Sequence, residues 1–247
     1  MRIPRSCHIL ALCLLASCSP RPLYVQEHQA QQYKIGREAP SDSSLKAMLQ
    51  PYKRGVDTQM RVIIGRTDIP LTKAQPESTL GNFLADAMLV AGQRIDPEVV
   101  AAIGNYGGIR LPYIAPGPIT RGKVYELMPF DNMLIIIEIP GAVLQQFCDA
   151  IAARKGWPLS GISFIIKDKK AVDIHIAGAA LNPGLVYKIA VNDYNARGGD
   201  NCDFLQRLKK QTTTVFLRDA MMDYIAALEL EGRPLHPVLQ NRIGYAE

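Results

Sequence analysis

Residues 187–204, YKIAVNDYNARGGDNCDF, decide how the rest of the chain is interpreted. The segment begins as a strand that alternates apolar and polar residues, breaks at residues 192–193, and ends in Gly198-Gly199, where a turn with positive φ costs nothing sterically. A strand that delivers Tyr194 and then Asp200 to such a loop can hold a ring by its face and hydroxyl groups by its edge. The alternative is a hairpin turn with a surface tyrosine, which this segment alone favours.

Three loops upstream carry side chains of the same kind. They are residues 77–82 (ESTLGN), 105–110 (NYGGIR) and 129–132 (PFDN). The first begins a helix, whose N-terminus is a ready site for an anion. The second offers the Asn105 amide, open backbone and the Arg110 guanidinium, which suits bidentate binding of phosphate or carboxylate. The third offers an aromatic ring, Phe130, and an amide, Asn132.

Hydrophobic periodicity predicts helices and strands in mixed order. The predicted helices are residues 78–92, 120–128, 141–153 and 219–230, with one more that begins at Asp42 or Ser43 and is kinked or interrupted by Pro51. The predicted strands are residues 61–65, 99–103, 133–139, 162–166, 171–176 and 187–191. Because there is no regular βαβ alternation and no internal repeat, the predicted fold class is α+β, a single mixed α/β domain.

Composition favours a folded domain over a nucleic-acid binder. The chain has 247 residues, 48% of them hydrophobic, which is enough to bury a sizeable core. The net charge of +5 falls to +3 without Arg2 and Arg5 of the first 17 residues. This is too weak to suggest nucleic acid, and no Lys/Arg cluster with interleaved aromatics is present.

The N-terminus predicts export. Two arginines precede an apolar run, residues 9–16, that is too short to span a bilayer. The sequence Leu-Ala-Ser-Cys that ends at Cys18 resembles a bacterial lipobox, which implies lipidation of Cys18. An ordinary signal peptide with an incidental cysteine is the alternative. Ser19 after the cysteine implies the outer membrane, on its periplasmic side or at the cell surface.

The predicted organisation follows from this processing and from the polar, Gln-rich stretch after Cys18. It comprises a signal peptide (1–17), a lipidated tether (18–40) and a folded domain (41–247). Two cysteines then remain free in the folded domain. Cys148 lies in the apolar pattern of a helix and is expected in the core, whereas Cys202 lies on the loop after Asp200. A disulfide between them stays open, because sequence cannot establish it.

Taken in order, the motifs G-N, N-x-G-G-I-R, P-F-x-N and D-Y-N-A-x-G-G-D resemble the C-terminal domain of the 5′-nucleotidase family, from about residue 62 to about residue 225. In that family the domain supplies substrate specificity. The resemblance implies that Phe130 and Tyr194 sandwich a nucleobase and that Asn132 reads its edge. It also implies that Asp200 accepts hydrogen bonds from ribose hydroxyls. Two further residues, Asn105 and Arg110, would face the phosphate.

Each of these assignments has an alternative. Phe130 could be a core residue, Arg110 a solvated surface charge and Asn105 the cap of a turn. The four glycines at positions 107, 108, 198 and 199 are expected to serve close backbone approach under either interpretation. An arginine of many relatives is replaced here by Ala74, with Lys73 beside it, so a point charge replaces a bidentate group.

The resemblance does not extend to catalysis. The full family begins with a metallophosphoesterase domain that holds two metals, and such chemistry needs several ligands for each ion. The four histidines, His8, His28, His175 and His236, have no partner ligands at useful spacing, and the sequence Gly-Asn-His-Asp/Glu is absent. No catalytic metal site and no cofactor are therefore expected in this chain, with divalent metals expected only in a partner.

The leading hypothesis is a nucleotide- or nucleoside-binding specificity domain of a 5′-nucleotidase-like phosphoester hydrolase that acts in nucleotide catabolism with a separate metallophosphoesterase chain. A non-catalytic, membrane-tethered nucleoside-binding lipoprotein is the second hypothesis. A structural domain with a degenerate pocket is the third.

Overall fold

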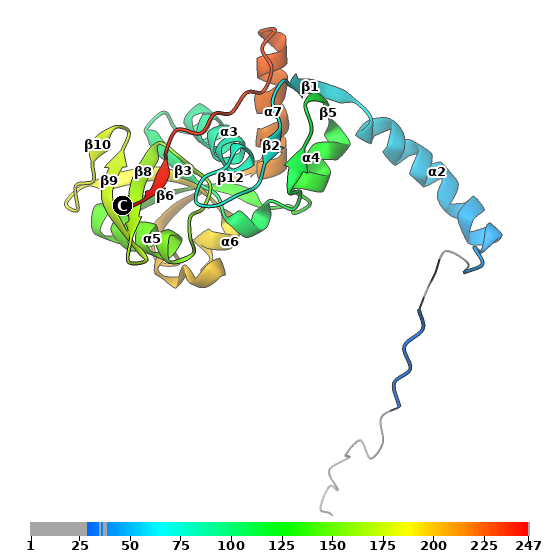
Figure 1. Cartoon of the computed structure of the whole chain (residues 1–247), viewed down its shortest axis with the longest axis horizontal. Helices are drawn as coiled ribbons and strands as arrows, with labels where there is room; N and C mark the ends of the chain where they lie inside the picture. The colour runs from blue at the N-terminus through cyan, green and yellow to red at the C-terminus, as the bar shows by residue number, and fades with distance from the viewer. Residues whose placement is uncertain (1–28, 35, 37–38, 247) are drawn as a thin grey trace, which may run out of the picture. The chain divides into compact units, whose positions relative to one another are not determined.

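The computed structural model describes residues 29–34, 36 and 39–246. The predicted signal peptide, Cys18 and much of the predicted tether lie outside the described residues. The chain divides between Met48 and Leu49 into two units. Every strand of the described residues belongs to the second unit, which contains the folded domain (Figure 1).

Helix α2, Ser43–Met60, begins where the sequence predicts, because the Asp42 carboxylate accepts from the backbone N–H groups of Ser44 and Leu45 at 2.8 and 3.1 Å. The prediction that Pro51 could interrupt this helix is wrong, since it continues to Met60. Proline removes one helical hydrogen bond, and the residues around Pro51 are exposed, so water can satisfy the carbonyl group that loses its partner.

A five-stranded mixed sheet forms the centre of the second unit. Its order is β12 (Lys209–Phe216), β6 (Met133–Pro140), β11 (Val186–Asn192), β3 (Val99–Ile103) and β7 (Leu159–Ser160). Only β11 and β3 run parallel; the other neighbours are antiparallel. The interior strand β6 is buried on both faces, with Ile135 and Ile137 in one core and Leu134 and Ile136 in the other. Burial on both faces explains its apolar run at residues 133–137.

Helices and a second sheet cover the two faces of this sheet. Helices α3 (Thr79–Ile95) and α7 (Leu217–Leu230) pack on one face, and Figure 1 shows them in the upper part of the domain. Helix α5 (Gly141–Ala153) packs on the other face, together with the second sheet. That sheet has the order β10 (Ala179–Ala180), β9 (Lys170–Ile176), β8 (Ile162–Lys167) and β13 (Ile243–Tyr245).

Short elements complete the domain. Two small antiparallel pairs are β1 (Ile63–Thr67) with β5 (Gly117–Thr120), and β2 (Leu71–Thr72) with β4 (Tyr113–Ile114). Helix α4 spans Arg121–Leu127. The loops of interest contain the short helices η1 (Tyr106–Gly108), α6 (Asp193–Ala196), η2 (Gly199–Asn201) and η3 (Asp203–Leu205).

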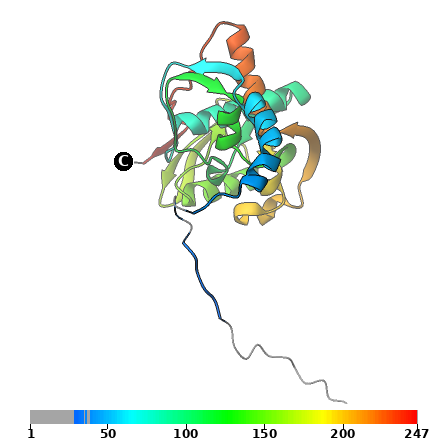
Figure 2. The ribbon, with the colours of Figure 1, turned by 90° about the vertical axis from the view of Figure 1, so that its right-hand side faces the viewer.

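The predicted fold class is confirmed, and so are most predicted elements. The sequence missed β12, which reads KKQTTTVF and buries only Thr213, because an edge strand with so few apolar residues has no hydrophobic period to detect. The C-terminal tail, where no strand is predicted, ends in β13 beside β8; in Figure 2 this red strand lies at the edge of the domain. Helix α7, predicted to begin at residue 219, begins at Leu217, with Phe216 at its cap.

Cys148 and Cys202 are both free and fully buried. The prediction of Cys148 as a core residue is confirmed. Burial raises the pKa of the Cys148 thiol to about 12 and that of the Cys202 thiol to about 11, so both thiols are neutral at physiological pH.

Candidate functional site

A cavity of about 340 Å³ lies where the three central strands meet their loops. Its lining comprises Asn105, Gly107, Gly108, Arg110, Phe130, Asn132, Tyr194 and Asp200. The structure thus brings all six residues predicted to bind substrate to one cavity.

Strand topology explains why three distant segments converge. Strands β3 and β11 are parallel neighbours, with Ile103 opposite Val191, so both reach the same edge of the sheet at their carboxyl ends. Strand β6 runs antiparallel to β11 and pairs Leu134 with Asn192, so it starts at that edge. The loops that follow β3 and β11 and the loop that precedes β6 must therefore meet there. Ligands of open sheets bind at such edges.

The ring of Tyr194 lies on the backbone of Gly199. A Cβ atom on Gly199 would lie 2.5–2.6 Å from three consecutive ring atoms, and near-equal distances to three such atoms mean that the glycine faces the flat side of the ring. Only glycine permits this approach. Tyr194 remains 46% exposed, so one face of the ring lies on Gly199 while other parts of the side chain remain accessible to solvent.

Asp200 sits in a left-handed turn, with φ of +55° after Gly198 at +97°. Its Oδ2 accepts from the Asn105 side-chain amide at 3.0 Å. Its Oδ1 lies 3.4 Å from the Tyr194 hydroxyl, a long contact, so this oxygen retains capacity to accept hydrogen bonds. Arg154 stabilises the turn by donating to the Asp200 carbonyl oxygen at 2.7 Å.

Phe130 packs against the core cluster of α3 and α7 and also lines the cavity, so its two interpretations are compatible. The Arg110 guanidinium lies over its ring, with the Cζ atom 4.8 Å from the centroid, as in a cation–π contact. Arg110 is exposed, yet its side chain has a definite partner. Asn132 lines the cavity while its carbonyl oxygen accepts from the Leu217 amide at 2.9 Å.

Asn105 precedes η1, but its side chain does not cap that turn, so the alternative of a simple turn cap is wrong. The side chain instead contacts Asp200 and accepts from Asn192 at 2.9 Å. Sequence reasoning missed Asn192 and its neighbour Asn195, which are both fully buried behind the cavity. The available signal was an amide placed at the end of an apolar strand, where burial obliges it to find partners.

Two other sequence features lie outside the cavity lining. The motif of residues 77–82 is structural: Ser78 caps α3, and the Glu77 carboxylate accepts from the Asn82 side chain at 2.6 Å and from the Gln240 amide at 2.9 Å. Lys73 donates to the Ile109 carbonyl oxygen at 2.7 Å and lies over the Tyr106 ring. Burial and then the nearby Arg110 charge lower the pKa of Lys73.

The expectation about glycines is confirmed for three of the four positions. Gly198 has positive φ, Gly199 touches Tyr194, and a Cβ on Gly108 would lie 2.8 Å from the Asn105 Oδ1. A Cβ on Gly107 would meet only the Asn105 amide at 3.8 Å, an ordinary contact, so close approach does not require glycine there.

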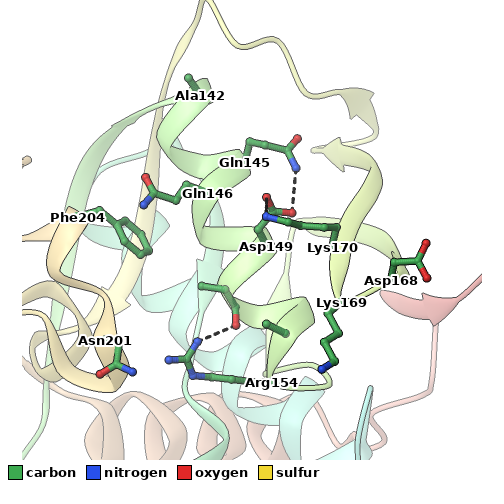
Figure 3. Close-up of a pocket in the computed structure, with 12 residues that line it drawn as sticks. Ala142, Gln145, Gln146, Asp149, Arg154, Asp168, Lys169, Lys170, Asn201 and Phe204 are labelled. Carbon is green, nitrogen blue, oxygen red and sulfur yellow. Dashed lines mark hydrogen bonds and ion pairs between the residues drawn. The ribbon is translucent and has the colours of Figure 1, made fainter.

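A larger cavity of about 620 Å³ lies beside α5 and is drawn in Figure 3. Several of its polar side chains bind the protein itself. Asp149 accepts from the Ala171 backbone amide at 2.9 Å and pairs with Lys170 at 3.2 Å. The Gln145 side chain also points to Asp149 (Figure 3).

Within residues 29–34, 36 and 39–246, no three His, Cys, Asp or Glu side chains gather in a way that could hold a metal ion. His175 Nδ1 lies 3.1 Å from the Asp173 carbonyl oxygen, and His236 pairs with Asp68 at 2.7 Å. In the same part of the chain, every helix is too short or too polar to span a membrane.

Comparison with known proteins agrees with the fold and with the sequence motifs. The family model described as "5'-nucleotidase, C-terminal domain" matches residues 62–207. The chain belongs to this family, and the resemblance inferred from the sequence is confirmed.

Individual relatives are longer than this chain. Protein UshA of Escherichia coli strain K12 is 25% identical over 185 residues, which cover 73% of this chain and 34% of UshA. The 5'-nucleotidase of Vibrio cholerae is 24% identical over 201 residues, covering 77% of this chain and 35% of the relative. The chain thus spans about a third of the length of these curated relatives.

Among solved structures, the 5'-nucleotidase precursor from Thermus thermophilus superposes with a TM-score of 0.72 at 26% identity. The alignment covers 85% of this chain and 44% of that one.

Proposed function

We propose that the cavity of about 340 Å³ binds a nucleoside or nucleotide, with the base held between Phe130 and Tyr194. The observation that carries the proposal is that both rings and the Asp200 carboxylate line this one cavity. Its size lies within the range of about 300–1,000 Å³ typical of small-molecule sites. Stacking on aromatic rings contributes about 1–3 kcal/mol per base.

The polar residues have separate roles in this proposal. Asp200 accepts from the ribose hydroxyls through its Oδ1, which has only a long contact with the Tyr194 hydroxyl, and Asn132 reads the base edge. Arg110 and Asn105 face the phosphate. The Arg110 guanidinium supplies the charge-assisted hydrogen bonds that a phosphate requires.

The proposed biochemical role is the specificity domain of a 5′-nucleotidase-like phosphoester hydrolase. Longer relatives, of which this chain spans about a third, one of them named a 5'-nucleotidase, support this role. Hydrolysis is assigned to a separate metallophosphoesterase chain, which would hold the divalent metals. The chain itself is proposed to carry no cofactor.

The proposed location is the outer membrane of a bacterium, on its periplasmic side or at the cell surface, through a lipid on Cys18. Replacement of Cys18 by serine tests this location. The variant is expected to leave the membrane fraction for the soluble fraction, and a variant that stays with the membrane contradicts lipid anchoring.

Calorimetric titration of the purified protein with adenosine and AMP tests binding. Binding of either supports the proposal, and no heat at millimolar ligand contradicts it. Phosphate release from AMP with Mn²⁺ tests whether hydrolysis requires a separate metallophosphoesterase chain. None is expected from this protein alone, whereas release is expected once a metallophosphoesterase partner is added.

A second candidate function is nucleoside capture without hydrolysis. It is favoured by the fact that, among the described residues lining the cavity, Arg110 is the only cation and already lies on the Phe130 ring. Equal affinity for adenosine and AMP supports this candidate, because a phosphate-binding site would favour AMP.

A further inference from the structure

Three asparagines form a hydrogen-bonded relay that reaches the cavity lining at Asn105. They are Asn195 of α6, Asn192 at the end of β11 and Asn105 after β3. Two of them are fully buried and Asn105 is 8% exposed. The relay ends on the Asp200 carboxylate.

The direction of every bond in the relay follows from its first donor. The Asn195 backbone N–H can only donate, and it donates to the Asn192 Oδ1 at 2.7 Å. The Asn192 Nδ2 is thereby left to donate to the Asn105 Oδ1 at 2.9 Å. The Asn105 Nδ2 must then donate onward, to the Asp200 Oδ2 at 3.0 Å.

We infer that Asn192 is a positioning residue that orients Asn105 and Asp200, and through them sets the preference of the cavity for ribose over 2′-deoxyribose. This inference rests on the proposed function, binding of a nucleoside. By fixing the Asn105 amide, Asn192 commits one oxygen of Asp200 and leaves the other, Oδ1, to the ligand.

The relay is distinct from the capping role of Asn192. Its Oδ1 caps the four-residue helix α6, and serine or aspartate at that position can keep the cap. Only a side chain with an N–H group at the Nδ2 position can also donate to Asn105. Substitutions can therefore remove the donor and keep the cap.

The first test is Asn192→Ser, measured by calorimetry with adenosine and 2′-deoxyadenosine. The hydroxyl is one bond shorter and does not bridge to Asn105. The ratio of the two dissociation constants is expected to shrink about 10-fold toward unity, as on loss of a charged hydrogen bond. A ratio equal to that of the unmodified protein overturns the inference.

The matched control is Asn82→Ser. Asn82 is equally buried, and its amide donates to Glu77 and to the Val238 carbonyl oxygen, outside the cavity lining. This control is expected to lower the melting temperature without changing the dissociation-constant ratio. A comparable change in the ratio would mean that any buried asparagine has this effect, which also overturns the inference.

The second test reverses the relay. In Asn192→Asp the cap survives, but Asn105 must turn its amide toward the new carboxylate, and its oxygen then faces Asp200. Combining it with Asp200→Asn restores complementarity, because the amide introduced at position 200 can donate to the turned Asn105. The double variant is therefore expected to melt higher than Asn192→Asp alone.

Additive effects of the two substitutions on the melting temperature overturn the relay, since independent sites add. This thermal test needs no ligand. If adenosine does not bind the unmodified protein, the proposed function is contradicted. The relay can still be tested by the melting temperatures.

Discussion

The two cavities beside the sheet differ in how their polar groups are used. In the larger one, beside α5, the Asp149 carboxylate is occupied by the Ala171 amide and by Lys170. In the smaller one, one oxygen of Asp200 has only a long contact with Tyr194, and the exposed Arg110 rests on a ring. In the larger cavity Asp149 thus holds neighbouring elements of the protein together, whereas in the smaller one the Asp200 Oδ1 retains capacity to accept a hydrogen bond.

Removal of both aromatic rings from the smaller cavity should have the largest effect on adenosine affinity. Phe130→Ala combined with Tyr194→Ala deletes the proposed base clamp, and each ring contributes about 1–3 kcal/mol. Adenosine binding is therefore expected to fall below calorimetric detection. Gln146→Ala, an exposed change in the larger cavity, is the control and should leave the affinity unchanged. Unaltered affinity in the double variant contradicts the clamp.

Arg110→Ala should distinguish binding of the phosphate from binding of the base. The loss of charge-assisted hydrogen bonds is expected to weaken AMP binding by about 1.5–3 kcal/mol. Adenosine should bind about as well or slightly tighter, because it no longer displaces a guanidinium from the Phe130 ring, a contact typically of about 0.5–1 kcal/mol. Titration of both ligands measures the difference. Equal losses for the two would mean that Arg110 does not face the phosphate.

Asp149→Ala should show that the larger cavity serves stability. It leaves the buried Ala171 amide without its acceptor, which costs about 1–3 kcal/mol of unfolding free energy. Urea denaturation measures this loss, and calorimetry should find adenosine affinity unchanged. A change in affinity without a change in stability would reverse the roles assigned to the two cavities.

Gly199→Ala and Gly107→Ala should differ although both glycines lie in site loops. The new methyl group at position 199 collides with the Tyr194 ring, while the one at 107 has room. A lower melting temperature is expected for the first variant only. If both variants melt like the unmodified protein, Tyr194 does not rest on Gly199.

At neutral pH the smallest effect concerns the buried Cys148 thiol, whose contribution changes only at high pH. Because burial raises the pKa of Cys148 to about 12 from 9.0, the folded state holds this proton more tightly than the unfolded state. Its contribution is fully present below pH 9 and is lost as the pH rises toward 12. The unfolding free energy of Cys148→Ala should therefore depend less on pH in that window than that of the unmodified protein. Equal slopes would contradict the effect.

The sequence allowed those parts of the site to be predicted that depend only on side-chain type and on the order of the strands. Tyr194 and Asp200 follow one strand, Asn105 follows another, and the structure brings them to one cavity. Their role as ligand contacts stays a prediction. The relay through Asn192 could not be predicted, because it depends on side-chain contacts between segments 87 positions apart.

Other features were hidden for different physical reasons. Strand β12 has almost no buried side chains and hence no period. The contact of Arg110 with Phe130 depends on the conformations of two side chains, which spacing does not specify. At residues 77–82 the sequence suggested a ligand site, but these residues lie outside the cavity lining. There the Glu77 carboxylate accepts hydrogen bonds from Asn82 and from Gln240 of the C-terminal tail.

The most direct measurement is the crystal structure of the protein with adenosine bound. We predict the base between Phe130 and Tyr194, the ribose within hydrogen-bond distance of the Asp200 Oδ1, and Arg110 displaced from the Phe130 ring. Adenosine bound beside α5, or a base that touches neither ring, would contradict this account.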